Sequence, residues 1–398
     1  MVKAVIFLAD GMADLPLASL GGRTPLEVVD TPAMDSIAAK GQNGTFLTLP
    51  DGLPTSSDVA NMSVLGFYPE KNYPGRGPIE AVSQNINLAP DDVAWRCNLV
   101  KVSPDGTLLD YSAGHIDNAV STEIMNLLQK EFGNADVSFY PGVSYRNLMV
   151  LHGRKFSNRV SYQKPDSSQG EKVENLLWTP TDNSPEAAYT VNFILDLFKR
   201  TAEYLKTCPV KSEATNIWPW SPGYLPKMAK FAERYAGKTG AIISAVDVIR
   251  GIGKCAGMDV YEVPGATGFI DTNYEGKVAA ALEALKTHDL VYLHVEAIDE
   301  CSHMGDLRLK MQAIELFDRR IVAPVLKALE GRNVNFAVLP DHPVPIELRK
   351  HTTTPVPVAV AGSAFAPDDV AKFSERLAPT GTLGHLSGDQ LVRKLLEL

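Results

Sequence analysis

The sequence predicts an α/β protein with a doubly wound, mostly parallel sheet and a smaller inserted α+β domain. Three observations lead to this fold class. Continuous apolar runs typical of buried strands recur along the chain, helical patterns lie between the late runs, and a stretch of shorter strands interrupts the series. Strands that alternate with helices form a parallel sheet covered by helices on both faces.

The elements of the main sheet follow from these runs. The opening VKAVIFLAD is a continuous apolar run that stops at Asp10-Gly11, and it predicts a buried strand. Between two later runs, apolar residues at helical spacing over 307–329 predict a helix that ends at Gly331. The later runs predict strands at 240–246, 289–297, 334–340 and 356–362.

The middle of the chain predicts the smaller domain. A turn at 103–106 separates two short strands. The elements expected here are strands at 93–103 and 107–112, a helix at 119–132, a strand at 145–152, a polar linker or exposed loops at 163–186, and an amphipathic helix at 188–206. We therefore expect residues 75–184 to form a domain inserted into a larger one made of residues 1–74 and 185–398.

Length, charge and cysteine content narrow the function classes. At 398 residues the chain has room for two domains. A net charge of −9 argues against nucleic acid as a partner, whereas an anionic substrate stays open because bound metal ions reverse the local field. The four cysteines lack CxxC spacing and fit reduced cytosolic thiols. No apolar stretch suits a signal peptide or a membrane span, so we expect a soluble cytoplasmic protein of unknown oligomeric state.

Aspartate and histidine residues lie beside the ends of predicted strands. Most of them follow a strand, and the last lies in the loop that enters one. Because ligands of open α/β sheets bind outside the carboxyl ends of the strands, we expect these side chains to meet at one edge of the sheet. In chain order they are Asp10, Asp299, His303, Asp341, His342 and His351.

The residue types indicate a site for two divalent metal ions. Three carboxylates and three imidazoles suit Mn²⁺ or Zn²⁺ better than Ca²⁺, which prefers oxygen ligands alone. The i, i+4 spacing of Asp299 and His303 places both on one side of a helical turn. Each residue alone also fits a turn, a helix start or a surface loop, but their joint placement favours the metal site. Two such ions orient an anion and stabilise an in-line displacement.

The segment LPTSSDVANMSVLGFYP (53–69) adds a candidate nucleophile. Ser56 or Ser57 precedes Asp58 at the start of a helix predicted to run through Leu65. A serine at this place ordinarily caps the helix. The position also suits a nucleophile, because N–H groups at a helix start hold a phosphoryl group and a metal ion lowers the hydroxyl pKa. From the residues alone both roles stay open.

Ten segments form a specific set in their order, spacing and local context. They are LADGMAD (8–14), TSSDVANMSVLGF (55–67), GRGPIEA (75–81), DYSAGHI (110–116), YRNLMV (145–150), GIGKCAGM (251–258), VPGATGFIDTNYEGK (263–277), HVEAIDECSHMGD (294–306), LPDHPVP (339–345) and HTTTPVP (351–357). These segments span nearly the whole chain. In them the chain resembles the cofactor-independent (2,3-bisphosphoglycerate-independent) phosphoglycerate mutases. The resemblance is to their shorter archaeal-type branch, within the alkaline phosphatase superfamily.

The resemblance implies a role for each candidate. Ser57 would be the nucleophile, because the longer branch of the family has N-S-E-V-G-H where this chain has SSDVAN (56–61). The ion expected is Mn²⁺, with Zn²⁺, Co²⁺ or Mg²⁺ as alternatives, and 2,3-bisphosphoglycerate is not required. One ion would be held by Asp10, Ser57, Asp341 and His342, and the other by Asp299, His303 and His351.

The resemblance also implies a reaction. An isomerase of glycolysis and gluconeogenesis would interconvert 2-phosphoglycerate and 3-phosphoglycerate: Ser57 takes the phosphoryl group, the glycerate reorients, and its other hydroxyl takes the group back. The inserted domain would hold the glycerate carboxylate and act as a lid, because water would otherwise intercept the phosphoserine. Anion contacts are expected from Arg76, His115, Arg146, and Arg250 or Lys254, although each also fits a surface ion pair.

Some features depart from the family pattern. Asn61 stands where the longer branch has a histidine, and the insertion is shorter, so that branch's substrate-binding arginines cannot be transferred. His294 lies within a strand and fits a hydrogen-bonded core histidine, and GIGK (251–254) lacks the spacing of a P-loop. The alternatives are a homoserine kinase of the same architecture, a metal-dependent phosphatase, and a non-catalytic metal-binding or scaffold protein.

Overall fold

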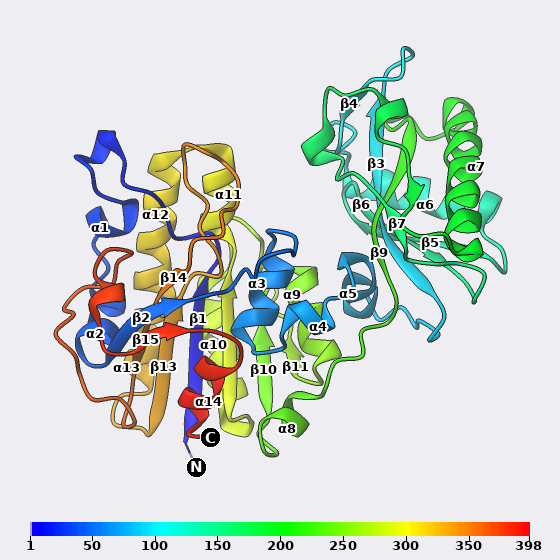
Figure 1. Cartoon of the computed structure of the whole chain (residues 1–398). Coiled ribbons are helices and arrows are strands. Elements are labelled where there is room, and N and C mark those ends of the chain that lie inside the picture. The colour runs from blue at the N-terminus through cyan, green and yellow to red at the C-terminus, as the bar shows by residue number, and fades with distance from the viewer. Residues whose placement is uncertain (1) are drawn as a thin grey trace. The chain divides into compact units, whose positions relative to one another are not determined.

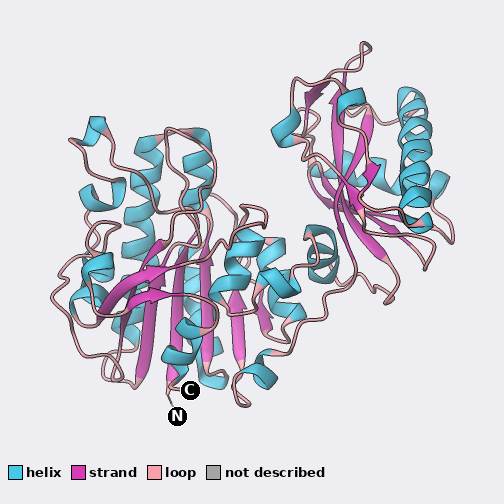
Figure 2. Cartoon of the chain, in the orientation of Figure 1, coloured by secondary structure: helices cyan, strands magenta, loops and turns pink. Residues whose placement is uncertain are grey.

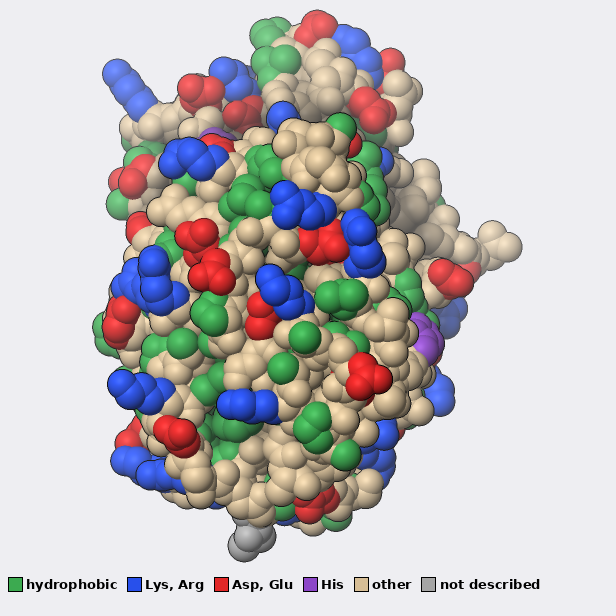
Figure 3. Space-filling model, turned by 90° about the vertical axis from the view of Figure 1, so that its left-hand side faces the viewer, with side chains coloured by type: hydrophobic (Ala, Val, Ile, Leu, Met, Phe, Trp, Pro, Cys, Tyr) green, Lys and Arg blue, Asp and Glu red, His purple; other side chains and the backbone are tan. Residues whose placement is uncertain are grey.

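The computed structural model describes residues 2–398, and the chain divides into two compact units (Figure 1). The larger unit comprises the chain up to Tyr73 together with Met228–Leu398, and the smaller unit is Pro74–Lys227. No helix among residues 2–398 has both the length and the hydrophobicity needed to cross a membrane. On the face shown in Figure 3, positive and negative side chains are interspersed, and hydrophobic side chains are scattered among them.

The larger unit is built on an eight-stranded sheet (Figure 2). Its central strands are almost fully buried, as expected for a parallel sheet covered on both faces. In sheet order the strands are β11 (Asp259–Tyr261), β10 (Gly240–Ile243), β12 (Leu290–Val295), β1 (Lys3–Ala9), β13 (Val334–Leu339), β14 (Val356–Ala361), β2 (Gln42–Phe46) and β15 (Gly384–Leu386). The strands β11 to β13 pair in parallel, so the expected mostly parallel sheet is confirmed.

Strand β14 runs opposite to the other strands. It pairs antiparallel with β13 on one side and with β2 on the other. The start of β14 therefore lies at the same edge of the sheet as the carboxyl ends of β1, β12 and β13. This reversal explains why His351, which precedes a strand, can join residues that follow strands.

Helices surround this sheet and complete the core. Phe7, Leu293 and Phe317 belong to one buried cluster that joins strands and helices. The helices are η1 (Ala18–Leu20), α1 (Pro25–Val28), α2 (Pro32–Ala39), α3 (Ser57–Val64), α4 (Pro69–Asn72), α8 (Phe231–Arg234), α9 (Asp247–Cys255), α10 (Tyr274–Thr287), α11 (Ala297–Met304), α12 (Leu307–Phe317), η4 (Asp318–Val322), α13 (Ala323–Ala328), η5 (Ala378–Thr380) and α14 (Gln390–Leu396).

The single helix expected over 307–329 contains a π-helical turn, η4, between α12 and α13. Pro324 follows this turn and has no N–H to donate to the preceding turn, which favours the change of hydrogen-bond pattern. The π-helical turn contacts helix α2: Asp318 within the turn accepts hydrogen bonds from the backbone N–H groups of Ala33 and Met34 at the start of α2. Asp318 thus supplies the cap that the α2 N-cap side chain does not.

The smaller unit is an antiparallel sheet packed with helices. Its sheet has the order β4-β3-β6-β5, and β9 pairs with β3 as well. The elements are α5 (Arg76–Ser83), β3 (Val93–Val102), β4 (Leu108–Asp110), α6 (Asn118–Phe132), β5 (Val137–Val143), β6 (Arg146–Leu151), β7 (Val160–Ser161), η2 (Asp166–Ser168), η3 (Val173–Asn175), β8 (Thr179–Pro180), α7 (Pro185–Thr207) and β9 (Asn216–Gly223).

The smaller unit extends beyond the expected boundary at residue 184, to Lys227. Strand β9 pairs with β3 over most of its length, and α7 packs against β9, so residues 185–227 complete this sheet. The segment 163–186 is also more than a linker. Trp178 within it is buried in the core, and its indole N–H donates to the carbonyl of Pro219. The polar composition of residues 163–186 led to the prediction of a linker or exposed loops, because only a few apolar residues among many polar ones make these contacts.

Candidate active site

The carboxyl edge of the larger sheet gathers a first group of predicted ligands. Asp10 follows β1, and Asp341 and His342 follow β13. Each of these three side chains offers a ligand atom within 4.8 Å of the other two. His342 Nε2 lies 3.4 Å from Asp10 Oδ1 and 3.3 Å from Asp341 Oδ2, and all three side chains are buried.

Ser57 joins this group from the start of α3. Its Oγ lies 3.2 Å from His342 Nε2. Ser56 occupies the N-cap position, but its hydroxyl donates to the carboxylate of Asp58 and makes no capping hydrogen bond. The side chain of Ser57 is thus directed to His342 in the first group. The neighbouring Ser56 does not cap the helix with its side chain.

The second group forms around α11. Asp299 and His303 lie one turn apart on this helix, and His351 comes from the loop before β14. His303 Nε2 lies 3.3 Å from Asp299 Oδ2 and 2.9 Å from His351 Nε2. Nδ1 of His303 donates to the carbonyl of Arg349 at 2.9 Å, which turns Nε2 toward the group.

The two groups adjoin each other. The rings of His342 and His351 stack with their centroids 3.9 Å apart and their planes at 21°. Gly11 lets the loop after β1 approach α11: its φ is +65°, and an added Cβ would lie 2.7 Å from both Cα and Oδ1 of Asp299. Only glycine suits this position, because any side chain would be strained and would clash with a predicted ligand.

The first group carries more negative charge than its surroundings stabilise. Burial, and then the charges of Asp341 and Asp299, raise the pKa of Asp10 well above its usual value. Burial also raises the pKa of Asp341 to about 7. Burial, followed by the nearby His351, lowers the pKa of His342 well below the usual value for histidine. Two crowded carboxylates beside a neutral imidazole favour a cation.

The second group has the opposite pattern. Burial acts to raise the pKa of Asp299, but the hydrogen bond from His303 and the charge of His351 hold it below its usual value. Burial acts to lower the pKa of His303, but the hydrogen bond with Asp299 raises it to about 9. A protonated His303 thus supplies positive charge beside the carboxylate of Asp299.

The residues present fit divalent metal ions. Among residues 2–398, Asp10 Oδ1 and Asp299 Oδ1 are buried oxygens that accept no hydrogen bond. Buried oxygens of this kind are rare in proteins unless a cation or water satisfies them. The donor set of carboxylates, imidazoles and one serine hydroxyl is typical of Mn²⁺ or Zn²⁺ sites. Each group thus offers one carboxylate oxygen that accepts no hydrogen bond, and at least one imidazole whose nitrogen is directed to that oxygen.

His294 orients Asp10 from behind. Its Nε2 lies 3.0 Å from Asp10 Oδ2, and its Nδ1 lies 3.1 Å from the hydroxyl of Ser244. Burial, and then the charge of Lys277, lower the pKa of His294 to about 3, so the ring is neutral. Nε2–H donates to the carboxylate, and Nδ1 accepts from Ser244. The expected core histidine is hydrogen-bonded as predicted, and its partner is a candidate ligand, which position in a strand did not reveal.

Asn61 connects Ser57, the candidate nucleophile, to the first group. Its Nδ2 donates to the carbonyl of Ser57 at 2.7 Å and to Asp341 Oδ2 at 2.8 Å, and its Oδ1 accepts from the hydroxyl of Tyr292. Asn61 lies one helical turn after Ser57, so the i, i+4 spacing was a usable signal. Tyr292 was missed, because a tyrosine in a buried strand has no sequence pattern that marks its partner.

A buried ion pair joins the two loops that bear the predicted ligands of the first group. Lys310 on α12 donates to Asp14 Oδ2 at 2.7 Å and to the carbonyl of Val344 at 2.9 Å. The carboxylate of Asp14 also accepts from the backbone N–H of Ile346. The pair therefore joins the loop after β1 to the loop after β13, and both side chains are fully buried.

Replacing Lys310 with methionine should destabilise the protein and weaken metal binding. The substitution leaves the carboxylate of Asp14 buried without its cation, which costs about 3–5 kcal/mol. Denaturant unfolding with and without Mn²⁺ measures the free energy of unfolding and the ion's contribution to it. The matched control is Lys286→Met, which removes an exposed pair with Glu283 and should change stability by less than about 1 kcal/mol. Equal effects of the two substitutions would contradict the role of Lys310.

The candidate anion contacts fall into two sets, one on helix α9 of the larger unit and one in the smaller unit. Arg250 and Lys254 lie on α9, which packs against α3, and Arg250 pairs with Asp247 on its own helix at 2.8 Å. The other three lie in the smaller unit: Arg76, His115 and Arg146. Arg146 lies 4.8 Å from the ring centroid of Tyr145, which His115 also contacts at 6.1 Å between centroids. The residues of GIGK are helical, so they form no phosphate-binding loop.

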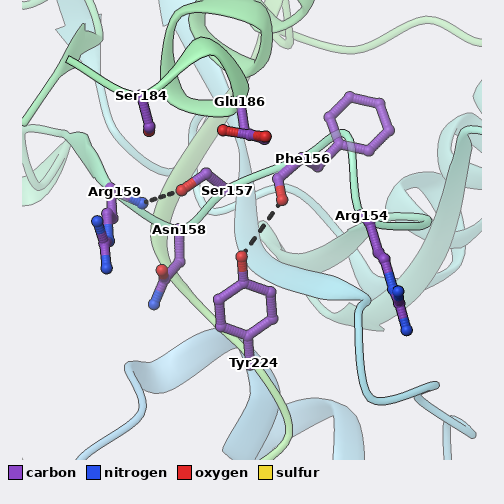
Figure 4. Close-up of a pocket in the computed structure, with 8 residues that line it drawn as sticks. All are labelled: Arg154, Phe156, Ser157, Asn158, Arg159, Ser184, Glu186 and Tyr224. Carbon is purple, nitrogen blue, oxygen red and sulfur yellow. Dashed lines mark hydrogen bonds between the residues drawn. The ribbon is translucent and has the colours of Figure 1, made fainter. Parts of the chain in front are cut away.

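A pocket of about 300 Å³ in the smaller unit contains two further arginines (Figure 4). Arg154 pairs with Asp91 at 2.9 Å, and Arg159 pairs with Asp182. Their charges are thus already matched by carboxylates. None of the candidate ligands or anion contacts lines this pocket.

Comparisons with known proteins agree with the geometry. The family model for 2,3-bisphosphoglycerate-independent phosphoglycerate mutase matches residues 38–211. A relative of that name from Methanosarcina acetivorans is 45% identical over 408 aligned residues and is covered in full, as is this chain. Another from Methanothrix thermoacetophila is 45% identical over 99% of this chain and 100% of the relative.

Two solved structures have the same fold. The PH0037 protein from Pyrococcus horikoshii superposes with a TM-score of 0.83 at 27% identity, over 100% of this chain and 97% of that one. A cofactor-independent phosphoglycerate mutase from Thermoplasma acidophilum superposes with a TM-score of 0.65 at 26% identity, over 100% and 99%. The predicted α/β sheet with a smaller α+β unit is confirmed. The chain belongs to the cofactor-independent phosphoglycerate mutases, in their archaeal-type branch.

Proposed function

We propose that this chain interconverts 2-phosphoglycerate and 3-phosphoglycerate through a phosphoserine on Ser57, with two divalent metal ions. One observation carries the proposal: the hydroxyl of Ser57 lies 3.2 Å from His342 Nε2, beside the buried carboxylates of Asp10 and Asp341. Family membership supports the reaction, and this contact supports Ser57 as its nucleophile. The two proposed ligand sets are Asp10, Ser57, Asp341 and His342 for one ion, and Asp299, His303 and His351 for the other.

The proposed chemistry takes place at Ser57 in two halves. Divalent ions, for which we propose Mn²⁺, would polarise the phosphoryl oxygens and lower the pKa of the serine hydroxyl. In the first half, Ser57 Oγ bonds to phosphorus as the bond to the substrate oxygen breaks, and that oxygen gains the proton that the serine gives up. In the second half, the other hydroxyl of the glycerate reverses these steps. The backbone N–H groups at the start of α3 favour the transferred anion.

The surrounding residues hold the nucleophile and the carboxylates in place. Asn61 fixes the first turn of α3 against Asp341, and His294 fixes the carboxylate of Asp10. Positioning of this kind lowers the barrier because the reacting groups need not be ordered in each cycle. We assign to the smaller unit the binding of the glycerate and the exclusion of water, which would otherwise hydrolyse the phosphoserine.

The test compares three reactions of the purified protein with Mn²⁺. The first is conversion of 3-phosphoglycerate, coupled to enolase; the second is phosphorylation of homoserine by ATP; the third is release of free phosphate from 3-phosphoglycerate. We expect turnover in the first reaction, none in the second, and phosphate release below about 1% of mutase turnover, because hydrolysis requires water at the phosphoserine. Homoserine phosphorylation without mutase turnover, or phosphate release as fast as mutase turnover, would refute the proposal.

A further inference from the structure

A tyrosine of the main sheet reaches the helix that bears Ser57. Tyr292 lies on β12, where its register partners are Ile6 on β1 and Ile242 on β10, and its side chain is fully buried. Its hydroxyl donates to Oδ1 of Asn61 on α3. A buried hydroxyl is costly unless it is hydrogen-bonded, and Asn61 meets this requirement. Tyr292 thus connects the middle of the sheet to the first turns of α3.

The contacts of Asn61 fix the direction of its amide group. The carbonyl of Ser57 can only accept a hydrogen bond, so the atom that faces it at 2.7 Å is Nδ2. Nδ2 also donates to Asp341 Oδ2 at 2.8 Å, and Oδ1 then faces the hydroxyl of Tyr292. Turning the amide over would place Oδ1 against the carbonyl of Ser57. The hydroxyl of Tyr292 opposes this rotation, because it supplies the donor that Oδ1 requires.

The direction of the amide matters to two candidate catalytic groups. Oδ1 of Asp341 accepts from the backbone N–H groups of Gly11 and His342, at 3.2 and 2.8 Å, and Oδ2 accepts from Asn61. The carboxylate of Asp341 is therefore held from both of its oxygens. The same amide holds the backbone of Ser57. One side chain thus sets the position of the candidate nucleophile relative to a candidate metal ligand.

The surroundings of Tyr292 keep its hydroxyl protonated. Burial, and then the charges of Asp341 and Asp10, raise the pKa of Tyr292 well above its usual value. At neutral pH the group is therefore an O–H donor, which suits a residue that holds Asn61 in place and does not exchange its own proton.

We propose that Tyr292 is a positioning residue for phosphoryl transfer, which through Asn61 fixes the Ser57 end of α3 against Asp341. The reaction itself rests on the proposed function. Transfer of a phosphoryl group requires the attacking oxygen to be aligned with phosphorus, so small displacements of a nucleophile lower the rate strongly. A released Asn61 should therefore lower kcat much more than it raises KM, because substrate binding does not depend on the exact place of the Ser57 hydroxyl.

Two other buried tyrosines of the larger unit provide matched controls. Tyr235 donates to the carbonyl of Leu65, the C-cap residue of α3, at 2.9 Å, so it holds the opposite end of the same helix. Tyr274 is fully buried, and its hydroxyl has no hydrogen-bond partner among residues 2–398. Replacement by phenylalanine removes the same oxygen at each of the three positions. Only at Tyr292 does it release Asn61.

The experiment measures mutase turnover and the thermal midpoint of the full chain with Mn²⁺. We expect Tyr292→Phe to lower kcat by about 10- to 100-fold and to change KM for 3-phosphoglycerate by less than about threefold. Tyr235→Phe should lower the thermal midpoint and keep kcat within about threefold, because it loses a hydrogen bond at the far end of α3. Tyr274→Phe should change neither. Equal losses of kcat in the Tyr235 and Tyr292 variants would indicate a general loosening of α3 and would overturn the proposal.

A double substitution tests whether Tyr292 acts through Asn61. Asn61→Ala removes the amide, so adding Tyr292→Phe to it should lower kcat by less than a further twofold or so. Independent losses that multiply in the double variant would contradict the proposed path. Asn61→Asp provides the test if Tyr292→Phe does not fold: it keeps the size of the side chain and the acceptor for Tyr292 but loses the donor to Asp341. Its kcat should fall by at least about 10-fold, and a native kcat would overturn the proposal.

The outcomes separate this proposal from the proposed function. Mutase turnover in the native protein with an unchanged kcat in Tyr292→Phe would overturn the positioning role and leave the function standing. Absence of mutase turnover in the native protein would refute the function.

Discussion

Replacing Ser57 with alanine should abolish mutase turnover. Loss of a covalent nucleophile removes the route through the phosphoserine and should lower kcat by at least about 1,000-fold. The Ser57 hydroxyl contacts His342 and caps nothing, so the fold should be retained. Mass spectrometry after incubation with 3-phosphoglycerate should detect a phosphorylated serine in the native protein and none in the variant.

The control for this substitution is Ser56→Ala. The two serines are neighbours, but the hydroxyl of Ser56 is directed to Asp58 and not to the ligand group. The control should keep mutase turnover within about threefold of the native protein. Turnover of the Ser57→Ala variant above about a tenth of the native rate would show that the phosphoryl group takes another route.

Removal of divalent ions should also abolish turnover, and it should lower the thermal midpoint. Ligands that bind only the folded state stabilise it, and two buried carboxylates of raised pKa repel each other without a cation. Because burial raises the pKa of Asp341 to about 7, protons compete with the ion there. Apparent metal affinity should therefore increase from about pH 6 to about pH 8. Dialysis against a chelator, followed by titration with Mn²⁺, measures both effects.

Single substitutions assign the ions to the two groups. Asp341→Asn and Asp299→Asn should each reduce the bound metal by about one ion per chain, because each removes a charged ligand of one group. Glu300→Gln is the matched control on α11, next to Asp299 in the sequence; Glu300 lies near Asp299 in a third, wholly acidic group. Two ions retained in the Asp299 variant, or one lost in the Glu300 variant, would contradict the assignment.

The positions of the proposed first-group ligands could be predicted from the sequence because they depend on the order of the strands. A buried strand followed by an aspartate places that aspartate at the carboxyl edge of a parallel sheet, whatever the details of packing. This reasoning located Asp10 and Asp341, which the structure brings together. The i, i+4 spacing similarly located Asp299 and His303 on one side of a helix.

Other features depend on contacts that a local pattern does not encode. The direction of β14 is set by its pairing with β13 and β2. The run VPVAVAG is apolar throughout, so its sequence does not indicate whether the strand is parallel or antiparallel to its neighbours. Lys310 and Arg96 are charged residues in buried elements, a signal that was present but did not identify their partners. The end of the smaller unit at Lys227 follows from the pairing of β9 with β3, which are far apart in the chain.

The reversal of β14 also bears on how this chain can vary. Because β14 starts at the edge where β13 ends, one connection carries proposed ligands of both groups: Asp341 and His342 at its beginning, and His351 at its end. Surface loops ordinarily tolerate insertions and deletions. This one is held at both ends by side chains that must keep their places, and Arg349 within it accepts the hydrogen bond that orients His303. The length of residues 343–350 is therefore a dimension of the proposed active site, as much as any distance between its proposed ligands.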